Sequence, residues 1–467
     1  MRKRLLFYFP SLALVSLLSI FFGLGKFQIL SVTIFSAVAL GSVVFWRWRV
    51  PLAFVGVAAL LASGLISVSY LLESAGFEII LFLVGMMIMV AFLEERRFFE
   101  ILIYKIIPFF GCSANRLVIV MLLLSALFAA LVNEITSILF MSAVMIHLAG
   151  RYRVNPVPFI IMQVFATNIG SGATAIGNPV GVVIAFKSGI SFGEFLRWAS
   201  PASILALVIA IPLLMGFFRK DIRQLGVSMK EQGLSDISPT GAQPLSRSEF
   251  LVPLGFFLGT IILLALHNQI EVLLNLPKNT MLFGFPLGAA GIALILERNR
   301  AREIVEMRID WWTLLFLILF FGAVGTLSFT GTTKFLSLKL LLWTGLDMVK
   351  LLVSLAAVTA FLSSSINNVS AVATIVPIIQ GLQAAGALVG VFTYPLWWVV
   401  LFAGIFFGNL TIIGSTANII AVGTIRRRKL GDLTVSQWIK PGLLASFPLL
   451  IIALMLVYLQ IPYMPWW

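Results

Sequence analysis

One acidic side chain stands in the middle of a long apolar run. The segment LVNEITSILF (131–140) places Glu134 beside Asn133 and close to Thr136, and no other carboxylate of the sequence lies so deep in an apolar stretch. A carboxylate in hydrocarbon is costly and marks a functional site by default. We therefore expect Glu134 to exchange a proton or bind a cation, with a purely structural acid as the alternative.

Three more polar stretches interrupt apolar runs: GSGATAIGNP (170–179), SSSINN (363–368) and GNLTIIGSTAN (408–418). Their Gly, Asn, Ser, Thr and Pro residues tolerate turns and cap helix ends. Non-helical backbone survives in a membrane only where protein or a cavity surrounds it. A broken helix directs free N–H groups and a positive dipole end at the break, which suits an anion. Its carbonyl, amide and hydroxyl oxygens suit Na⁺.

The alternative is that these small residues only permit close helix packing. The symmetric placement of the breaks, described below, favours a binding site. We expect the substrate and ion to be bound by Asn133, Glu134, Thr136, Asn168, Thr174, Asn178, Asn367, Asn368, Ser370, Asn409, Thr411, Ser415 and Asn418, with Na⁺ near Asn133, Glu134, Asn367 and Asn368.

The composition places these residues in a membrane protein. The 467 residues are 60% hydrophobic and 11% charged, with a mean hydropathy of +1.08, whereas soluble domains are about 25% charged. One cysteine, Cys112, and two histidines, His147 and His267, exclude a disulfide framework and a Cys/His metal site. Without a catalytic constellation we expect no enzyme and no cofactor. The net charge of +14 comes from short basic clusters between apolar runs, typical of cytoplasmic loops and not of a nucleic-acid surface.

A spanning helix needs about 20 apolar residues. We expect an all-α polytopic protein with about 11 transmembrane helices. Four regions are too long for one simple span: 116–148 and 350–382 are predicted to be re-entrant hairpins, because each arm has only about 15 residues, and 158–186 and 394–425 are predicted to be broken helices. Charge alone would equally allow true double spans. The ordinary spans are expected at 5–25, 28–46, 51–73, 77–95, 200–218, 249–267, 279–297, 311–330 and 441–460.

Charge also predicts the orientation. We interpret the first apolar run, which follows MRKR, as a signal-anchor helix, with a cleaved signal peptide as the alternative. With the N-terminus in the cytoplasm, clusters such as EERR (94–97), FRKDIR (218–223) and RRRK (426–429) all fall inside. We therefore expect a multi-pass protein of the plasma or inner membrane.

The two halves of the chain repeat each other. Residues 125–146 align with 359–380, and 172–185 align with 409–422, in the same order and at similar spacing. The first hairpin is expected to open to the cytoplasm and the second to the outside, which makes the repeats inverted, as in many secondary transporters. The predicted organisation is N-terminal helices at 1–76, a first repeat at 77–218, an aperiodic polar cytoplasmic linker at 219–248, and a second repeat half at 249–467.

These motifs resemble the ion transporter superfamily and its citrate-transporter-like domain. The similarity covers roughly 78–460 and is carried by LFLVGMMIMVAFLEERRFFE, LVNEITSILF, ATNIGSGATAIGNPVGVVIA, LSSSINNVSAVATIVPII and GNLTIIGSTANIIAVG. Members include arsenite permeases, the melanosomal P protein, NhaD-type sodium/proton antiporters and sodium/dicarboxylate symporters. The resemblance implies two re-entrant hairpins and two unwound helices around the substrate, an elevator-like movement and a homodimer.

The hairpin tips distinguish the branches of this superfamily. Antiporters and arsenite permeases usually carry Asn-Asp where this chain has Asn133-Glu134, which keeps the charge. The antiporter-like branch often has Asp-Asn where this chain has Asn367-Asn368, and dicarboxylate symporters carry Ser-Asn-Thr at both tips. We therefore expect a secondary active transporter of a small anion or oxyanion, similar to the arsenite-permease branch and coupled to H⁺ or Na⁺. A Na⁺(Li⁺)/H⁺ antiporter and a Na⁺-coupled dicarboxylate or citrate transporter are the alternatives, and a channel is the rival class.

Overall fold

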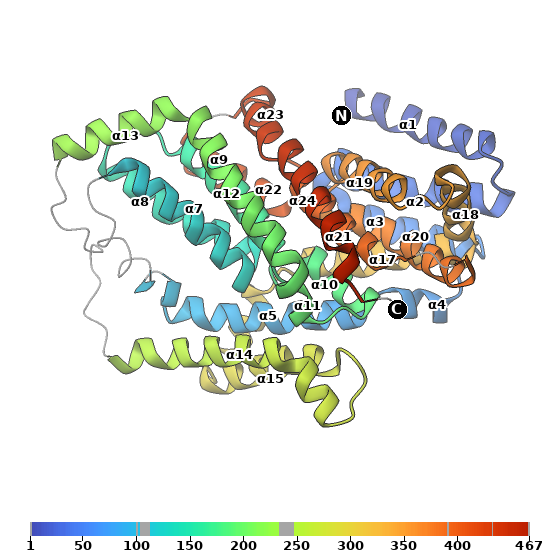
Figure 1. Cartoon of the computed structure of the whole chain (residues 1–467), viewed down its shortest axis with the longest axis horizontal. Coiled ribbons are helices and arrows are strands. Elements are labelled where there is room, and N and C mark those ends of the chain that lie inside the picture. The colour runs from blue at the N-terminus through green and yellow to red at the C-terminus, as the bar shows by residue number, and fades with distance from the viewer. Residues whose placement is uncertain are drawn as a thin grey trace. The chain divides into compact units, whose positions relative to one another are not determined.

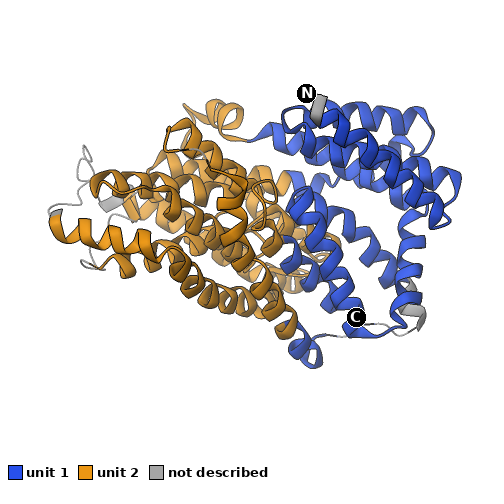
Figure 2. Cartoon of the chain, turned by 90° about the horizontal axis from the view of Figure 1, so that it is seen from above, with its two compact units in different colours: residues 1–80, 310–404, 457–467 blue, residues 81–309, 405–456 orange. Residues whose placement is uncertain are grey.

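The computed structural model describes residues 2–99, 101–102, 113–232, 247–389, 392–431 and 433–465 (Figure 1). This part of the chain is helical and contains no strand. It forms two compact units, each assembled from separate stretches of sequence. Unit 1 comprises 1–80, 310–404 and 457–467, and unit 2 comprises 81–309 and 405–456 (Figure 2). Both units therefore draw on both halves of the chain, while the predicted repeat boundaries stay a prediction.

Unit 1 contains the N-terminal helices and the second hairpin. Helix α17 packs against α2, α3 and α4, and α19 and α20 are the arms of the hairpin. The bounds are α1 Arg2–Phe21, α2 Lys26–Val44, α3 Arg49–Ala62, α4 Val68–Ser74, α17 Trp311–Phe329, α18 Thr332–Thr344, α19 Met348–Ser365, α20 Asn368–Val389 and the first part of α21 Tyr394–Gly408.

Unit 2 contains the first hairpin, formed by α7 and α8, and both halves of the first broken helix, α9 and α10. The bounds are α5 Phe77–Glu95, α7 Ala114–Leu131, α8 Glu134–Arg151, α9 Val157–Ser171, α10 Pro179–Ser188, α11 Phe192–Glu194, α12 Ser200–Phe217, α13 Arg219–Gln232, α14 Arg247–Leu273, α15 Thr280–Leu296, α16 Ala301–Glu303, α22 Thr416–Arg427, α23 Val435–Leu444 and α24 Phe447–Gln460. Helices α5, α21 and α24 cross the unit boundary.

Ten helices of the described residues are long and apolar enough to cross a membrane. The predicted class, an all-α polytopic membrane protein, is therefore confirmed. Two details were wrong. The expected span 51–73 is two helices, α3 and α4, because the chain turns between them at Gly64 with a φ of +66°. Helix α18 was not anticipated.

The arms of the first hairpin are longer than expected. Helices α7 and α8 each have 18 residues and an apolar composition sufficient for a span. The length argument for a re-entrant hairpin, which assumed about 15 residues for each arm, is therefore wrong. The re-entrant path itself stays a prediction.

The helix boundaries reproduce the sequence repeat. Helices α5, α7 and α8 begin 234 residues before α17, α19 and α20, and α9 and α10 begin 237 residues before α21 and α22. The breaks thus lie at equivalent positions in both halves. The inverted orientation in the membrane stays a prediction.

The predicted linker contains an unexpected helix. We described 219–248 as polar and without periodicity, but Ile222, Leu225 and Met229 form a buried stripe on α13. A stripe at this spacing marks one face of a helix, so the expected lack of periodicity is wrong for 219–232, while the cytoplasmic linker stays a prediction. The stretch 233–246 lies outside the described residues.

Candidate functional site

The first break lies between α9, which ends at Ser171, and α10, which begins at Pro179. Asn178 caps α10: its Oδ1 accepts the Gly181 N–H at 2.9 Å, and its Nδ2 donates to the Ser171 carbonyl at 2.9 Å. A Cβ at Gly177 would lie 2.3 Å from the same carbonyl oxygen. Only glycine fits there, so the chain can fold back tightly on the end of α9.

The second break, between Gly408 and Thr416, is built in the same way. Ser415 caps α22 by accepting the Ala417 N–H at 3.2 Å. A Cβ at Gly414 would lie 2.5 Å from the Gly408 carbonyl oxygen. Cap and glycine therefore stand at positions equivalent to those of the first break, and both predicted broken helices are confirmed.

A buried amide cluster joins the two breaks. Asn168, in the last turn of α9, donates through Nδ2 to Asn409 Oδ1 at 2.7 Å and to Asn418 Oδ1 at 2.8 Å. Its Oδ1 accepts the Ser415 hydroxyl at 3.0 Å. All four side chains are fully buried. Most buried amides in proteins are hydrogen-bonded, and these bonds fix the second break against the end of α9.

The tip of the first hairpin docks on the first break. Asn133 caps α8, because its Oδ1 accepts the Thr136 N–H at 2.8 Å. Glu134 is the first residue of α8 and is fully buried. Its backbone N–H donates to the Gly177 carbonyl at 2.9 Å. The predicted acid therefore lies in the first turn of a helix, directly beside a broken helix.

Close packing reinforces this contact. The Thr174 hydroxyl in the first break donates to the Ala130 carbonyl at the end of α7. A Cβ at Gly170 would lie 2.3 Å from the Ala126 carbonyl oxygen, so α9 lies directly on α7. Thr174 thus satisfies one of the carbonyls that a helix end leaves without a partner.

Three capped helix starts therefore belong to one unit: α8 at Asn133, α10 at Asn178 and α22 at Ser415. Hydrogen bonds connect them. The Glu134 N–H of α8 donates to the carbonyl of Gly177, the residue before Asn178. Asn178 Nδ2 donates to Ser171 Oγ and the Ser171 hydroxyl donates to the Asn168 carbonyl, each at 2.8 Å, and Asn168 Oδ1 accepts the Ser415 hydroxyl. Helix N-termini carry partial positive charge and stabilise anions. This arrangement can hold the Glu134 carboxylate or an anionic ligand.

Ten of the predicted site residues lie in unit 2, and the other three, Asn367, Asn368 and Ser370, lie in unit 1. In unit 2, the Thr411 carbonyl accepts from Asn418 Nδ2 at 2.8 Å. A single site that unites both hairpin tips, and the Na⁺ ion expected between them, stay predictions. The described residues hold no group of three or more His, Cys, Asp or Glu side chains suited to a metal.

Sequence reasoning missed two polar residues on α9. Gln163 and Thr167 are at most 1% exposed, and their side-chain polar atoms have no hydrogen-bond partner within the described part of the chain. Leaving such a group unsatisfied costs about 1–3 kcal/mol. They lie one turn apart on α9, and Thr167 directly precedes Asn168, so both add buried polar groups to this helix. The signal was available, because glutamine in the run FIIMQVFA (159–166) is itself a polar residue in a predicted span.

Trp438 was also missed. Its indole Nε1 donates to the Asn409 carbonyl at 3.0 Å, and its ring lies edge-on to Phe165 with centroids 5.3 Å apart. Trp438 therefore supports the second break from α23. Its local sequence, SQWIK (436–440), gave no hint of this role.

A second buried carboxylate corrects our expectation that Glu134 would be alone. Glu271 is 2% exposed, because α14 extends to Leu273 and passes the predicted span end. Its carboxylate accepts the backbone N–H groups of Asn279, Met281 and Leu282 at 2.7–3.3 Å. It therefore caps the start of α15, which lies beside α14 (Figure 1). This acid has a structural role.

A cationic cavity lies between α8 and α22. Its volume is about 710 Å³, and its lining includes His147, Arg427 and Arg428 together with Leu139 and Thr424. Both helices begin at the caps described above, and the cavity is near their opposite ends. Its polar lining is basic and contains no acid, so it favours an anion.

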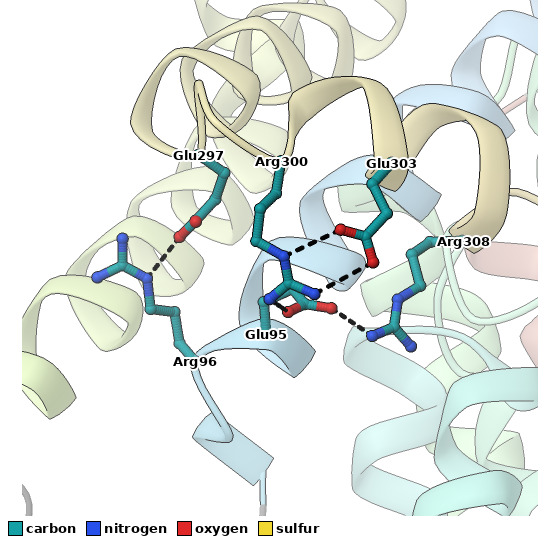
Figure 3. A network of polar contacts seen from close by, with 6 residues as sticks. All are labelled: Glu95, Arg96, Glu297, Arg300, Glu303 and Arg308. Atoms are coloured by element: carbon teal, nitrogen blue, oxygen red, sulfur yellow. Dashed lines mark hydrogen bonds and ion pairs between the residues drawn. The ribbon is translucent and has the colours of Figure 1, made fainter.

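A network of ion pairs holds the end of α5. Glu95 accepts from both Arg300 and Arg308, and Arg96 Nε donates to Glu297 at 2.7 Å (Figure 3). Arg300 also pairs with Glu303 at 3.1 Å, and this hydrogen bond holds the pKa of the exposed Glu303 carboxyl below its usual value. The network ties α5 to the segment that follows α15.

The same helix end contacts the first hairpin. The Thr136 side chain hydrogen-bonds the carboxyl of Glu94, the residue before Glu95. Our expectation that Glu94 and Glu95 stand at a span end agrees with the end of α5 at Glu95. Thr136 therefore connects the capped tip of the first hairpin to this helix end.

Comparison with known proteins agrees with this architecture. Residues 42–403 of this chain match the protein family described as "Citrate transporter". The uncharacterized transporter Rv2684 of Mycobacterium tuberculosis is 28% identical over 387 residues, covering 83% of this chain and 86% of the relative. The human P protein is 25% identical over 455 residues, and the match covers 83% of this chain and 53% of that protein.

The fold also has a solved counterpart. The YdaH transporter of Alcanivorax borkumensis, whose crystal structure is described as having an unusual topology, superposes with a TM-score of 0.56. The alignment covers 84% of this chain and 86% of that one at 14% identity, so it supports the fold alone. The family match, which covers most of the chain, supports more: this protein is a multi-pass membrane transporter that belongs to the citrate transporter family, within the ion transporter superfamily.

Proposed function

We propose that the protein is a secondary active transporter of a small anion or oxyanion, coupled to H⁺ or Na⁺. The observation that carries this proposal is the docking of a carboxylate-bearing hairpin tip against a broken helix, through Glu134 N–H and the Gly177 carbonyl. Broken helices supply N–H groups, dipole ends and carbonyls to a substrate and its coupling ion. The amide cluster around Asn168 supplies neutral polar groups beside them.

The charge of the surroundings favours an anion as the transported solute. Three helix N-termini belong to the hydrogen-bonded cluster, and each contributes a positive partial charge. The basic cavity with His147, Arg427 and Arg428 lies toward the other ends of α8 and α22. A cavity lined by cations raises the local concentration of anions, so it would serve as a vestibule for the solute.

Glu134 is the proposed coupling group. It is fully buried in a polar setting, and intramembrane carboxylates that exchange protons or bind cations recur in transporters. The movement that exposes the site to each side is, in this proposal, an elevator-like displacement of hairpins and broken helices. The protein would work as a homodimer in the plasma or inner membrane with its N-terminus in the cytoplasm.

The test is uptake into proteoliposomes under imposed pH or Na⁺ gradients. Arsenite, citrate, a dicarboxylate, sulfate and Na⁺ or Li⁺ are offered separately. We expect one anion to accumulate against its gradient when H⁺ or Na⁺ is supplied, with saturation at high concentration. Gradient-driven movement of Na⁺ or Li⁺ without any anion would replace this proposal by the antiporter, and downhill flux without coupling would replace it by a channel.

A further inference from the structure

A second basic cavity lies away from the proposed transport site. Its volume is about 820 Å³, and it is bounded by the end of α12, one face of α13 and the start of α7. Helix α12 ends a candidate span at Phe217, and α13 begins two residues later. The cavity therefore lies at the end of a spanning helix, where lipid headgroups are found.

Three cations of α13 line this cavity: Arg219, Arg223 and Lys230. At 3.6 residues per turn they fall within an arc of about 40° on the helix. Asp221 projects from the opposite side. All three cations are exposed, and no acidic side chain within the described residues forms an ion pair with them. This face of α13 therefore carries a positive charge that no acidic side chain of the described residues neutralises through an ion pair.

The opposite wall adds N–H donors. Helix α7 begins here with Ser113, Ala114 and Asn115, and the Ser113 side chain makes no capping hydrogen bond. The first N–H groups of a helix have no partner inside the helix. The start of α7 lies close to α13, because a Cβ built on Gly226 of α13 would be 3.5 Å from Ala114 Cβ.

The rest of the lining is apolar. Met215, Ile222 and Val227 contribute to the same cavity. A ligand that fits it therefore combines a negative head with a hydrocarbon part. Basic pockets beside spanning helices bind anionic lipid headgroups in this way.

We propose that this cavity binds the phosphate group of an anionic phospholipid. Arg219, Arg223 and Lys230 neutralise the phosphate, and the apolar wall takes the adjoining glycerol and acyl groups. The bound lipid would fasten α13 to α7 in unit 2. Free phosphate has the same headgroup chemistry, so the test includes it as a separate ligand.

The test measures binding and does not depend on transport. The full chain is purified in a neutral detergent, and its melting temperature is recorded with added phosphatidylglycerol, phosphatidylcholine or inorganic phosphate. We expect phosphatidylglycerol to raise the melting temperature, because ligands of the folded state stabilise it, and phosphatidylcholine to have no effect. Native mass spectrometry of the same samples counts the bound lipid.

The variants assign the effect to the cavity. Each of Arg219→Gln, Arg223→Gln and Lys230→Gln should raise the dissociation constant of phosphatidylglycerol about fivefold, the contribution of one cation near an anionic surface. Lys220→Gln removes an exposed cation of α13 that does not line the cavity and should bind like the wild type. The triple variant combines Arg219→Gln, Arg223→Gln and Lys230→Gln. If inorganic phosphate protects the wild type but not the triple variant, and phosphatidylglycerol protects neither, the cavity is a phosphate site filled from solution and the lipid proposal is overturned. A triple variant that binds phosphatidylglycerol like the wild type, or equal protection by phosphatidylcholine, overturns the proposal.

Discussion

The two hairpin tips share a scaffold and differ in chemistry. The two arms of the first hairpin begin at positions equivalent to those of the second hairpin. An asparagine precedes the second arm in each hairpin: Asn133 in unit 2 and Asn367 in unit 1. The next residue is Glu134 in the first tip and Asn368 in the second. Only the first tip carries an ionisable group, so a repeated fold holds an asymmetric charge.

The backbone of the tips differs as well. Asn133 has an extended conformation with a φ of 177°, whereas Asn367 has a φ of +145°, a region that residues other than glycine rarely adopt. Asn368 is fully buried, and its Nδ2 has no acceptor within the described residues. The second tip therefore combines backbone strain with a buried donor, while the first is a relaxed cap with a carboxylate. Strain of this kind gathers at ligand sites and switch regions.

The largest expected effect comes from removing the charge of the first tip. Glu134→Gln should lower gradient-driven uptake about a hundredfold, the effect of losing a positioned proton-transfer group, and Glu134→Asp should retain coupling because the charge is kept. The measurement is uptake in proteoliposomes with and without the gradient. Glu303→Gln, which removes an exposed carboxylate of the Arg300 pair, is the control and should transport normally. Normal coupling in Glu134→Gln would refute our assignment of the coupling group.

The strain at the second tip gives a smaller effect on stability. Asn367, whose Oδ1 accepts the Val369 N–H at 2.9 Å, and Asn133 both cap a helix, so each change to alanine should cost about 1 kcal/mol. Asparagine and alanine both bear the positive φ at position 367, which costs about 1–3 kcal/mol and which glycine relieves. Asn367→Gly should be more stable than Asn367→Ala, whereas the same pair at Asn133 should differ by only a few tenths of a kcal/mol. Melting temperatures of the purified variants test this. Equal Gly–Ala differences at the two tips would contradict the strain.

The breaks, unlike the tips, should respond alike. Gly177→Ala and Gly414→Ala both direct a Cβ at a backbone carbonyl, at 2.3 and 2.5 Å, and each should cost about 1–3 kcal/mol, as overpacking does. Gly423→Ala, in α22 with open space around it, is the matched control and should be neutral or slightly stabilising. Thermal unfolding of the three variants is the measurement. A tolerated alanine at only one break would show that the two breaks are not equivalent.

Much of the architecture could be predicted because the polar interruptions have strong local signals. Asparagine and serine caps, glycines and prolines in apolar runs predicted both broken helices to within a few residues. The division of 51–73 was missed because its turn, at Gly64, lies inside an otherwise apolar run. Helix α13 was missed because its apolar stripe, Ile222, Leu225 and Met229, lies in a polar segment. The length of the α7 and α8 arms was underestimated because the predicted hairpin, 116–148, starts two residues after α7 begins and ends three residues before α8 ends, and because Glu134, which belongs to α8, was assigned to the break.

The sequence by itself determined that this is a membrane transporter with a repeated plan, and it predicts that Glu134, the four breaks and their amides form the transport site. Hydropathy and helix-breaking residues act locally, so they can be recognised in one dimension. Only the tertiary structure decided that Asn168 joins both breaks and that the Glu134 N–H donates to the Gly177 carbonyl. It also decided that Glu271 caps α15, and that one cavity is lined by Arg219, Arg223 and Lys230. Each of these depends on side chains brought together from separate helices, and the packing of helices is a property of the whole fold.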